Sequence, residues 1–422
     1  MKAIRDLQSS FANASCDVLP SEIRLEHQFS SGLARSVGIY SLKIAKVRRY
    51  LVLAFGNDAS VSQRNRMMLG LMPPRVTALF ARNYFVQSYG GSGQYVEAME
   101  YLKGPTLAEA ISTHPTDQLL GYVRSVAQSL NTLHSIRAVS HTAQAPYCDS
   151  YHKARIAFRL RQLSRLFPSL AAAINRNGCR VRIQGASPTE IPGLRVTLRS
   201  LSALKRKKED VACLIHGDCK PENIILSDTR ARFIDAKLEY GDPFVDYAKL
   251  YQWLFIGPIL STPPGEKPLL TQQNESCISM HGARRALRPD FNMDLRCPRS
   301  VRKAIYQLMS QLGADRWSYD EWGRFCLCSG SWLVWQAGRL MEVASERASV
   351  ARAHSDGRSG KVIHSSKFKL PIARDLAESK TLHVRMAFVL GAYYLWVASE
   401  ILRTRTVRWT LLRPLIACRR TR

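Results

Sequence analysis

Residues 213–250 read CLIHGDCKPENIILSDTRARFIDAKLEYGDPFVDYAKL, and this stretch decides the fold. Its pattern predicts a strand, a tight loop, two short strands joined by a turn, a second loop and a helix. The short strands would hold Asp218, Asn223 and Asp235 at one end of two buried strands. Two carboxylates and one amide oxygen are hard ligands that suit magnesium-bound phosphates. The alternative is that each residue merely caps a turn, which explains any one of them better than the set.

This segment resembles the catalytic core of the aminoglycoside phosphotransferase and choline kinase family, whose fold is protein-kinase-like. The family pattern is HGD-x4-N, then an Asp about a dozen residues later, then GDP-x2-D. The matching residues here are His216, Gly217, Asp218, Asn223, Asp235, Gly241, Asp242, Pro243 and Asp246. The resemblance implies a two-lobed α+β fold, with a small antiparallel sheet in the amino-terminal lobe and a larger, mainly helical carboxy-terminal lobe.

The same resemblance implies an ATP-dependent O-phosphotransferase, which moves the γ-phosphoryl group to a hydroxyl of a sugar, amino alcohol or related metabolite. Asp218 would orient the acceptor hydroxyl and accept its proton, as the catalytic residue. Asn223 and Asp235 would hold Mg²⁺ against the β and γ oxygens of ATP. We expect His216 to hydrogen-bond the loop backbone, and the acids of the GDP-x2-D motif to be structural.

Hydrophobic alternation over residues 23–56 predicts three strands, which a helix at 59–72 would cover. Two more strands, within 76–89 and 93–102, would complete the sheet. We therefore expect an amino-terminal extension (1–22), an amino-terminal lobe (23–103), a helical lobe (104–404) and a basic tail (405–422). The helical lobe would contain the catalytic segment 213–250, an irregular insertion at 262–300, and helices at 117–135, 152–174, 247–255, 317–348 and 380–404.

The nucleotide would be bound by backbone groups of the amino-terminal lobe. Gly32 lies where the family has a short phosphate-covering loop, although an ordinary hairpin turn explains it equally well. Residues 95–107, YVEAMEYLKGPTL, resemble the family's hinge. By that resemblance the backbone around Glu100 and Leu102 would pair with the adenine edge, and Met99 would line the back of the pocket.

The chain departs from the family on the third strand, where Ala54 stands in place of a Lys or Arg that reaches the α and β phosphates. The helix at 59–72 also lacks the acid that pairs with it and offers Gln63 and Asn65 there. The absence of the lysine is consistent with the absence of the helix acid, because a Glu without its Lys would be an unpaired charge. Lys43 or Lys46 is a candidate substitute. The alternative is a catalytically impaired, kinase-like pseudoenzyme or nucleotide-binding scaffold.

The chain carries 61 Lys and Arg against 33 Asp and Glu, a net charge of +28. Such a field attracts nucleotides, phosphorylated metabolites, nucleic acid or an anionic membrane, and it disfavours a polycationic acceptor. Because Arg is spread along the whole chain, we expect a small-molecule hydroxyl acceptor rather than nucleic acid as the partner. The tail 405–422 interleaves Arg with apolar residues and can lie on an anionic membrane surface; the alternative is an exposed end of the last helix.

Ten cysteines without paired metal spacing are typical of a reducing compartment. The first residues lack the apolar core of a signal peptide, and the most apolar run, 386–399, is shorter than the roughly twenty residues that span a bilayer. We therefore predict a cytoplasmic protein without a transmembrane segment. These motifs neither name the acceptor nor choose between ATP and GTP.

Overall fold

The computed structural model of the chain describes residues 22–29, 35–44, 47–88, 94–138, 150–183, 187–205, 212–227, 230–255, 270–273, 290–293, 299–355 and 378–412. The chain divides into two compact units, one formed by 1–138 with 213–241 and one by 139–212 with 242–422. This division differs from the lobe boundary that we expected after residue 103. The reason is that the helix at 116–134 packs on strands of the catalytic segment and joins it to the first unit.

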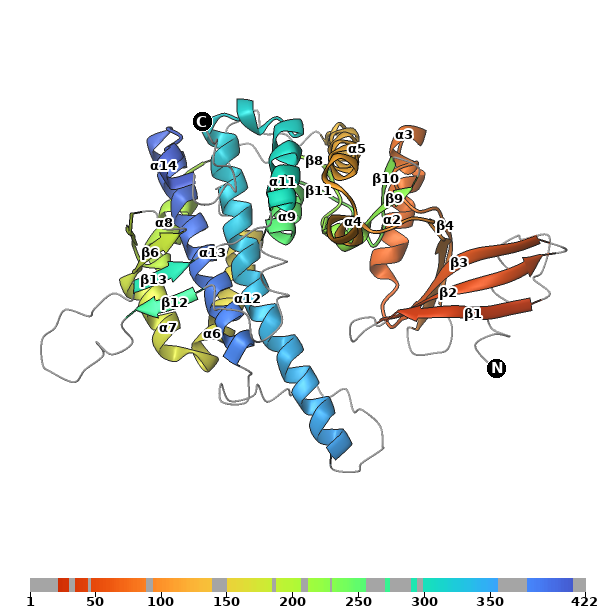
Figure 1. Cartoon of the computed structure of the whole chain (residues 1–422), viewed down its shortest axis with the longest axis horizontal. Coiled ribbons are helices and arrows are strands. Elements are labelled where there is room, and N and C mark those ends of the chain that lie inside the picture. Colours follow the sequence, from red (N-terminus) through yellow and green to blue (C-terminus); the bar gives the residue numbers. More distant parts are fainter. Residues whose placement is uncertain are drawn as a thin grey trace, which may run out of the picture. The chain divides into compact units, whose positions relative to one another are not determined.

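The first unit is built on a five-stranded antiparallel sheet of order β1-β2-β3-β5-β4. The strands are β1 (Glu22–Phe29), β2 (Arg35–Ile44), β3 (Val47–Gly56), β4 (Asn83–Ser88) and β5 (Tyr95–Glu100). In Figure 1 β1, β2 and β3 lie side by side, as the predicted meander requires.

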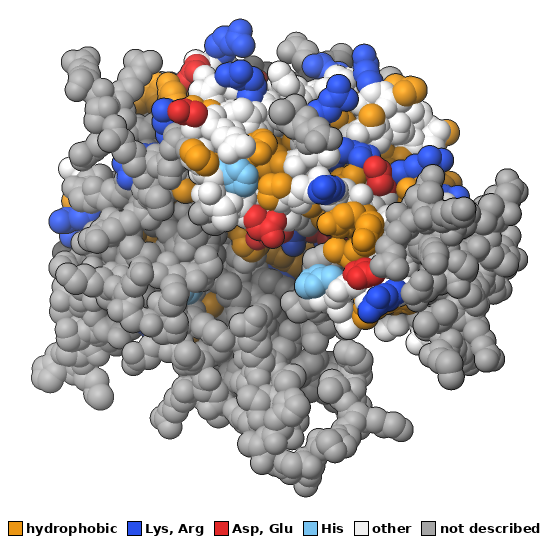
Figure 2. Space-filling model, turned by 45° about the vertical axis from the view of Figure 1, so that its right-hand side comes forward, with side chains coloured by type: hydrophobic (Ala, Val, Ile, Leu, Met, Phe, Trp, Pro, Cys, Tyr) orange, Lys and Arg blue, Asp and Glu red, His pale blue; other side chains and the backbone are white. Residues whose placement is uncertain are grey.

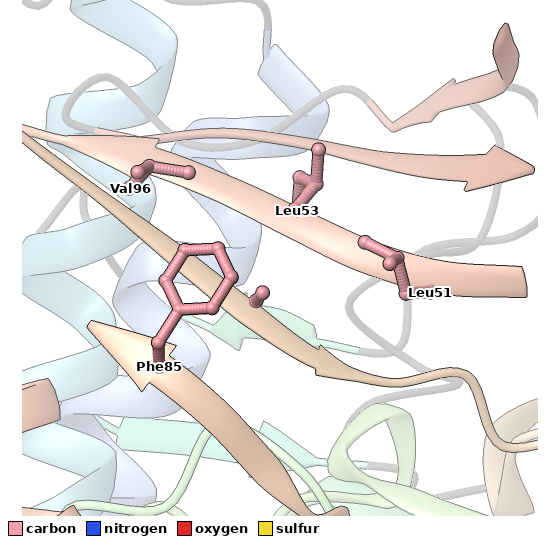
Figure 3. Packing of buried hydrophobic residues seen from close by; sticks show 5 residues of the cluster. Leu51, Leu53, Phe85 and Val96 are labelled. Carbon is pink, nitrogen blue, oxygen red and sulfur yellow. The ribbon is translucent and has the colours of Figure 1, made fainter. Parts of the chain in front are cut away.

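One face of this sheet carries a compact apolar cluster. Leu51 and Leu53 alternate on β3 and pack with Phe85, Val96 and Ala98, each of which is at most 4% exposed. Figure 3 shows the side chains of Leu53, Phe85 and Val96 gathered over neighbouring strands. Burying such a side chain is worth about 1.5–3 kcal/mol, so the cluster makes β3 and β5 a firm support for the hinge that follows β5.

The described residues of the first unit form the helices α2 (Ser60–Gly70), α3 (Pro74–Thr77), α4 (Leu107–Thr113) and α5 (Thr116–His134). Helices α2 and α5 confirm the sequence prediction. The strand predicted within 76–89 is wrong in its first part, where α3 begins with Pro74 at a position that suits proline, and β4 starts only at Asn83. Helix α4 begins with a capping box between Thr106 and Glu109.

The catalytic segment forms two small antiparallel pairs. Strands β9 (Ile224–Ser227) and β10 (Arg230–Phe233) make one hairpin, preceded by the 3₁₀ turn η2 (Pro221–Asn223). Strand β8 (Cys213–Ile215) pairs with β11 (Glu239–Gly241). Sequence reasoning found the first three strands and missed β11, which has three residues and no apolar alternation.

The second unit is mainly helical. Its α-helices are α6 (Ser150–Leu166), α7 (Pro168–Ala172), α8 (Leu194–Ala203), α9 (Phe244–Phe255), α11 (Arg299–Gln311), α12 (Tyr319–Ser355), α13 (Glu378–Thr404) and α14 (Trp409–Leu412). Shorter turns are the π-helical η1 (Ala173–Asn177) and the 3₁₀ turn η4 (Ala314–Arg316). The helix predicted at 152–174 is interrupted before Pro168, where proline lacks the N–H that a continuous helix needs.

Helices α12 and α13 form the core of this unit and lie along each other (Figure 1). Their close approach depends on two glycines, because a Cβ on Gly330 would lie 2.8 Å from the carbonyl oxygen of Gly391. Within α13, the segment His383–Thr404 is long and apolar enough to cross a membrane by length and composition alone. It exceeds the run 386–399 that we expected. However, 83% of its apolar window is buried inside the unit, as in a core helix.

The predicted insertion at 262–300 is not irregular throughout. Strands β12 (Leu270–Gln273) and β13 (Asp290–Met293) join β6 (Cys179–Ile183) and β7 (Thr189–Ile191) in a sheet of order β12-β13-β6-β7, with β13 parallel to β6. The prediction was wrong here because four-residue strands carry little local pattern. Their pairing with β6, about a hundred residues earlier in the chain, is a tertiary effect.

The start of the basic tail packs on the second unit. The Trp409 ring lies 5.5 Å from that of Trp322, Leu412 is buried, and the Tyr393 hydroxyl donates to the carbonyl of Leu411 at 3.3 Å. Residues 413–422 lie outside the described residues, so the membrane contact stays a prediction. On the face drawn in Figure 2, Lys and Arg side chains are spread over the described surface with Asp and Glu between them.

Candidate active site

The β9–β10 hairpin brings two of the predicted site residues to one place. Asn223 immediately precedes β9 and Asp235 closely follows β10, and Ile224 is paired with Phe233 across the hairpin. The next bond in the ladder runs from the Ile234 N–H to the Asn223 carbonyl at 3.0 Å. Both polar residues therefore lie at the same end of the hairpin, as the sequence predicts.

Asp218 is tied to the same end through its main chain. The Asn223 side-chain nitrogen Nδ2 donates to the Asp218 carbonyl at 3.0 Å, and both residues are at least 92% buried. This bond fixes the amide of Asn223, and it leaves the oxygen Oδ1 as the atom available to a cation. The structure thus brings the three predicted residues into one loop cluster.

His216 fixes this loop through hydrogen bonds to its backbone. It is fully buried; its Nδ1 accepts from the Asp218 N–H at 3.2 Å, so Nε2 carries the proton and donates to the Ile234 carbonyl at 3.2 Å. Its ring also stacks on Phe80 and meets Phe233 edge-on. With both nitrogens bound to backbone, His216 joins the two loops, which confirms the predicted hydrogen bonds to the loop backbone.

The donor set fits a magnesium ion chelated by phosphates. Asp235 is exposed and has a φ of 53°, a left-handed conformation that is uncommon outside glycine and often found at functional sites. Among the described residues there is no cluster of three or more His, Cys, Asp and Glu that could hold a metal alone. A carboxylate from Asp235 and an amide oxygen from Asn223 match the family of hard ligands that Mg²⁺ combines with substrate phosphates.

A lysine that the motif does not include lies beside Asp218. The Lys237 ammonium is 3.6 Å from the Asp218 carboxylate oxygen Oδ2. Its main-chain N–H donates to the His216 carbonyl at 2.7 Å. Gly217, with a φ of 74°, allows this approach, since a Cβ there would lie 2.6 Å from the Lys237 carbonyl oxygen. Sequence reasoning missed Lys237 because only the backbone pairing of the two loops brings it to Asp218.

The predicted hinge residues Met99, Glu100 and Leu102 lie at the end of β5 and just after it. Met99 is half-buried, and Leu102 is buried just beyond the strand. The Glu100 carboxylate pairs with both terminal nitrogens of Arg232 at 2.8 Å and accepts from the Arg82 N–H at 3.0 Å. The hydrogen bonds from Arg232 hold the pKa of Glu100 below its usual range. Glu100 therefore ties the hinge to the catalytic hairpin through its side chain, while the adenine contacts of the three residues stay predictions.

Of the other two predicted nucleotide-binding residues, Gly32 and Lys43, the structure describes only the position of Lys43. Gly32 lies outside the described residues, as does Lys46. Lys43 pairs with Arg48 on β3, whereas Ala54 pairs with Val37. Arg48 and Ala54 are six residues apart, about 20 Å along a strand, which is farther than a lysine side chain reaches. This register argues against Lys43 as the substitute for the missing strand lysine.

Ala54, at the position of the expected lysine, packs in the apolar interior, and a buried acid lies beside it on the next strand. Ala54 is fully buried and pairs across the ladder with Glu97. The Glu97 carboxylate, 6% exposed, accepts from Ser62 on α2 at 2.9 Å and from the Asn83 amide at 2.5 Å. The acid of this region therefore lies on the strand, and a hydroxyl on the helix binds it.

Asn65, one of the two residues at which the family's helix acid was expected, binds the loop after Asp235. Its amide nitrogen donates to the Ala236 carbonyl at 2.6 Å, and its amide oxygen accepts from the Leu238 N–H at 3.1 Å. One side chain thus satisfies two backbone groups on either side of Lys237. The sequence places Asn65 at this helix position, but its partners follow only from the path of the loop.

The GDP-x2-D acids lie in the second unit and are structural, as expected. Asp242 accepts from the Phe244 N–H at 3.0 Å, at the start of α9. It also faces the Arg324 guanidinium of α12 at 3.4 Å, and the same guanidinium lies 3.0 Å from Asp320. Asp246 is fully buried within α9. These contacts join α9 to α12.

A sheet with one helix, a hinge and a loop cluster of this type define a phosphotransferase of protein-kinase-like, two-lobed α+β fold. The model of the phosphotransferase enzyme family known as APH matches residues 76–287, half of the chain. The chain belongs to this family.

Solved structures of low identity resemble the chain, and no curated protein matches it. One is the streptomycin–ATP complex of APH(2″)-IIa, at 13% identity and a TM-score of 0.43, covering 84% of this chain and 94% of that one. A second is a putative fructosamine-3-kinase from Thermobifida fusca, at 12% identity and a TM-score of 0.43, covering 78% of this chain and 91% of that one. A third is ADP-bound APH(2″)-Ib, at 13% identity and a TM-score of 0.40, covering 90% of this chain and 98% of that one.

Proposed function

We propose that this protein transfers the γ-phosphoryl group of ATP to a hydroxyl of a small metabolite, such as a sugar or an amino alcohol. The observation that carries the proposal is the junction of Asp218 and Asn223, with Asp235 at the same end of the hairpin. Membership of the phosphotransferase family supports the reaction class. The acceptor class and the use of ATP are part of the proposal.

In the proposed reaction the acceptor oxygen attacks the γ-phosphorus, and the bond between that phosphorus and the β,γ-bridging oxygen breaks. The bonding electrons leave on ADP. Asp218 orients the acceptor hydroxyl and takes its proton as the new oxygen–phosphorus bond forms. Because His216 and Asn223 fix the backbone of Asp218 from two sides, the carboxylate has a defined position before the substrate arrives.

Mg²⁺, when bound to the nucleotide, would neutralise the charge that builds up on the phosphate oxygens. The Asp235 carboxylate and the Asn223 amide oxygen are the groups that would hold it. The backbone at Asp235 is left-handed, and the bond to the Asp218 carbonyl engages the nitrogen of the Asn223 amide, so that its oxygen is the atom for the cation.

The net charge of +28 favours a neutral or anionic acceptor over a polycationic one, because like charges repel. The proposal therefore ranks phosphorylated or neutral sugars and amino alcohols ahead of aminoglycosides, even though some structures of similar fold are aminoglycoside phosphotransferases.

The test is a panel of hydroxyl-bearing metabolites, scored by ADP release and by a phosphoryl mass gain on the acceptor. The parent protein is compared with Asp218→Asn and with Asp117→Asn, a matched change at an exposed position in the first turn of α5. We expect an acceptor that the parent and Asp117→Asn phosphorylate and Asp218→Asn does not. Equal phosphorylation by Asp218→Asn would overturn the proposed role of the site.

A second candidate function is nucleotide binding without transfer, and the burial of Ala54 at the expected lysine position favours it. A scaffold of this kind would bind ATP and form no product with any acceptor in the panel. Nucleotide-dependent thermal stabilisation that disappears in Asp235→Ala, without turnover, would support this candidate over the first.

A further inference from the structure

Ala54 stands where a strand lysine would be expected to reach the nucleotide phosphates. Ala54 is fully buried between its ladder partners Val37 and Glu97, so the strand offers no positive charge to a triphosphate there. The register keeps Lys43 about 20 Å away along the sheet. A nucleotide triphosphate carries several negative charges, and its transfer needs them neutralised. Beside Mg²⁺, a lysine near the catalytic loop can supply part of this charge.

Hydrogen bonds hold the backbone of Lys237 and of both neighbouring residues. Its own N–H donates to the His216 carbonyl at 2.7 Å. Asn65 binds the residues before and after it, Ala236 at 2.6 Å and Leu238 at 3.1 Å. The loop is therefore joined to the catalytic loop on one side and to α2 on the other. The side chain of Lys237 therefore extends from a backbone whose position is fixed.

The side chain of Lys237 is placed to exchange partners. It is 55% exposed, and its ammonium lies 3.6 Å from the Asp218 carboxylate, beyond the length of a strong charge-assisted hydrogen bond. Ion pairs at such exposed positions are worth about 1 kcal/mol or less. A triphosphate with its charges near Asp235 is a stronger anion than one carboxylate, so the ammonium can leave Asp218 for it at little cost.

We propose that Lys237 binds the γ-phosphate of the nucleotide and supplies a positive charge that Ala54 on β3 does not. This inference rests on the proposed function. In the reaction Lys237 stays protonated and gains contact with the phosphate oxygens, while the γ-phosphoryl group moves from ATP to the acceptor oxygen, ADP leaves, and the acceptor proton moves to Asp218. Withdrawal of the ammonium from Asp218 also leaves that carboxylate to the acceptor hydroxyl.

The test compares the affinities of MgATP and MgADP for the parent protein and three variants, by calorimetry. Lys237→Met removes the charge, Lys237→Arg keeps it, and Lys303→Met removes a charge at an exposed position of α11. A charge-assisted contact with the γ-phosphate should make Lys237→Met bind MgATP about tenfold or more weakly while MgADP changes little. Lys237→Arg should restore most of the loss, and Lys303→Met should match the parent.

Several results separate this inference from the function on which it rests. A parent protein that binds MgATP in an Asp235-dependent manner, with Lys237→Met unchanged, overturns only the role of Lys237. An equal loss for MgATP and MgADP also overturns it, because the γ-phosphate would not be the contact. A parent protein that binds neither nucleotide overturns the proposed function and this inference together. Thermal denaturation of each variant checks that the fold is intact.

Discussion

The loop cluster of Asp218, Asn223 and Asp235 and the strand–helix pair β3–α2 relate to the family in opposite ways. In the cluster these three residues occupy the expected loops. In β3–α2 the expected ion pair is absent, with Ala54 on the strand and Asn65 on the helix. Here neutral side chains bind backbone and a buried acid instead.

The difference teaches how each region keeps its geometry. The cluster is held by hydrogen bonds between side chains and loop backbone, which no substitution on β3 disturbs. Helix α2 is held by hydrogen bonds from the neutral side chains of Ser62 and Asn65. These bonds do not depend on a lysine on β3. Loss of the ion pair therefore removes a positive charge from the site without removing the support of α2.

The largest expected effect breaks the cluster itself. Asp218→Asn should lower kcat/KM for the acceptor by roughly 10²–10⁴, the range that a positioned proton acceptor contributes. Steady-state kinetics measures it. The loss should fall mainly on kcat, because the amide keeps the shape of the side chain; an unchanged kcat would mean that Asp218 is not the catalytic base.

The next effect is on stability, at the junction of the hinge and the catalytic hairpin. Gly104 has a φ of 147°, and a Cβ there would lie 2.1 Å from the Leu226 carbonyl oxygen. We expect Gly104→Ala to lower the free energy of unfolding by about 2–4 kcal/mol, through strain and a forced shift of β9.

Gly121 is the matched control for that substitution. It lies within α5 with no heavy atom near its added Cβ, so Gly121→Ala should raise the free energy of unfolding by about 0.5–1 kcal/mol. Urea titration of the two variants measures both changes. Equal effects at the two glycines would contradict the close approach of the hinge to β9.

A smaller effect tests the neutral attachment of α2. Asn65→Ala removes two bonds to the loop that carries Asp235 and Lys237, and we expect a loss of about 1–3 kcal/mol in unfolding free energy. Activity should fall as well, because the loop loses its fixed position. Gln63→Ala, at an exposed position of the same helix, should leave both nearly unchanged, since Ala is the better helix former; a similar fall there would contradict the role of the two Asn65 bonds.

The smallest expected effect is on stability, and it concerns the ion pair of Glu100 with Arg232, which joins the hinge to the hairpin. Because the pKa of Glu100 is lowered from its ordinary value of 4.5, the ionised form is bound more tightly in the folded protein. Its contribution to stability is present above the unfolded pKa and is lost as pH falls through the folded pKa. Glu100→Gln should cost about 1 kcal/mol or less at pH 7 and progressively less below pH 4.5.

Thermal denaturation of parent and Glu100→Gln over that pH range follows the change. Glu222→Gln, at an exposed position of η2, serves as the control and should show no such pH dependence. A stability difference for Glu100→Gln that grows as the solution becomes more acidic would contradict the sign derived for this carboxylate.

The sequence predicts the parts of the fold that local pattern specifies. Alternation identified β1, β2 and β3, and the motif identified the loops of Asp218, Asn223 and Asp235 with the correct hairpin between them. Strands β12 and β13 were missed because their signal is their pairing with β6, far away in the chain. Segment α3 was misassigned because apolar residues near Pro74 fit a strand and a helical turn equally.

At the site, residue types were predictable and partners were not. Asn65 was recognised as the residue in place of an acid, but its bonds to Ala236 and Leu238 follow from the loop path. Lys237 carries no motif signal, and its approach to Asp218 depends on the left-handed Gly217. Lys43 looked suitable by type alone, and the strand register places it elsewhere.

The central claim is that Asn223 and Asp235 bind a metal-chelated triphosphate, and calorimetry of ATP binding with and without Mg²⁺ tests it most directly. The account predicts that the parent protein binds ATP only with Mg²⁺ and that Asp235→Ala loses this binding while keeping its thermal midpoint, since Asp235 is exposed. Binding of ATP by Asp235→Ala with the parent's affinity and metal dependence would contradict it.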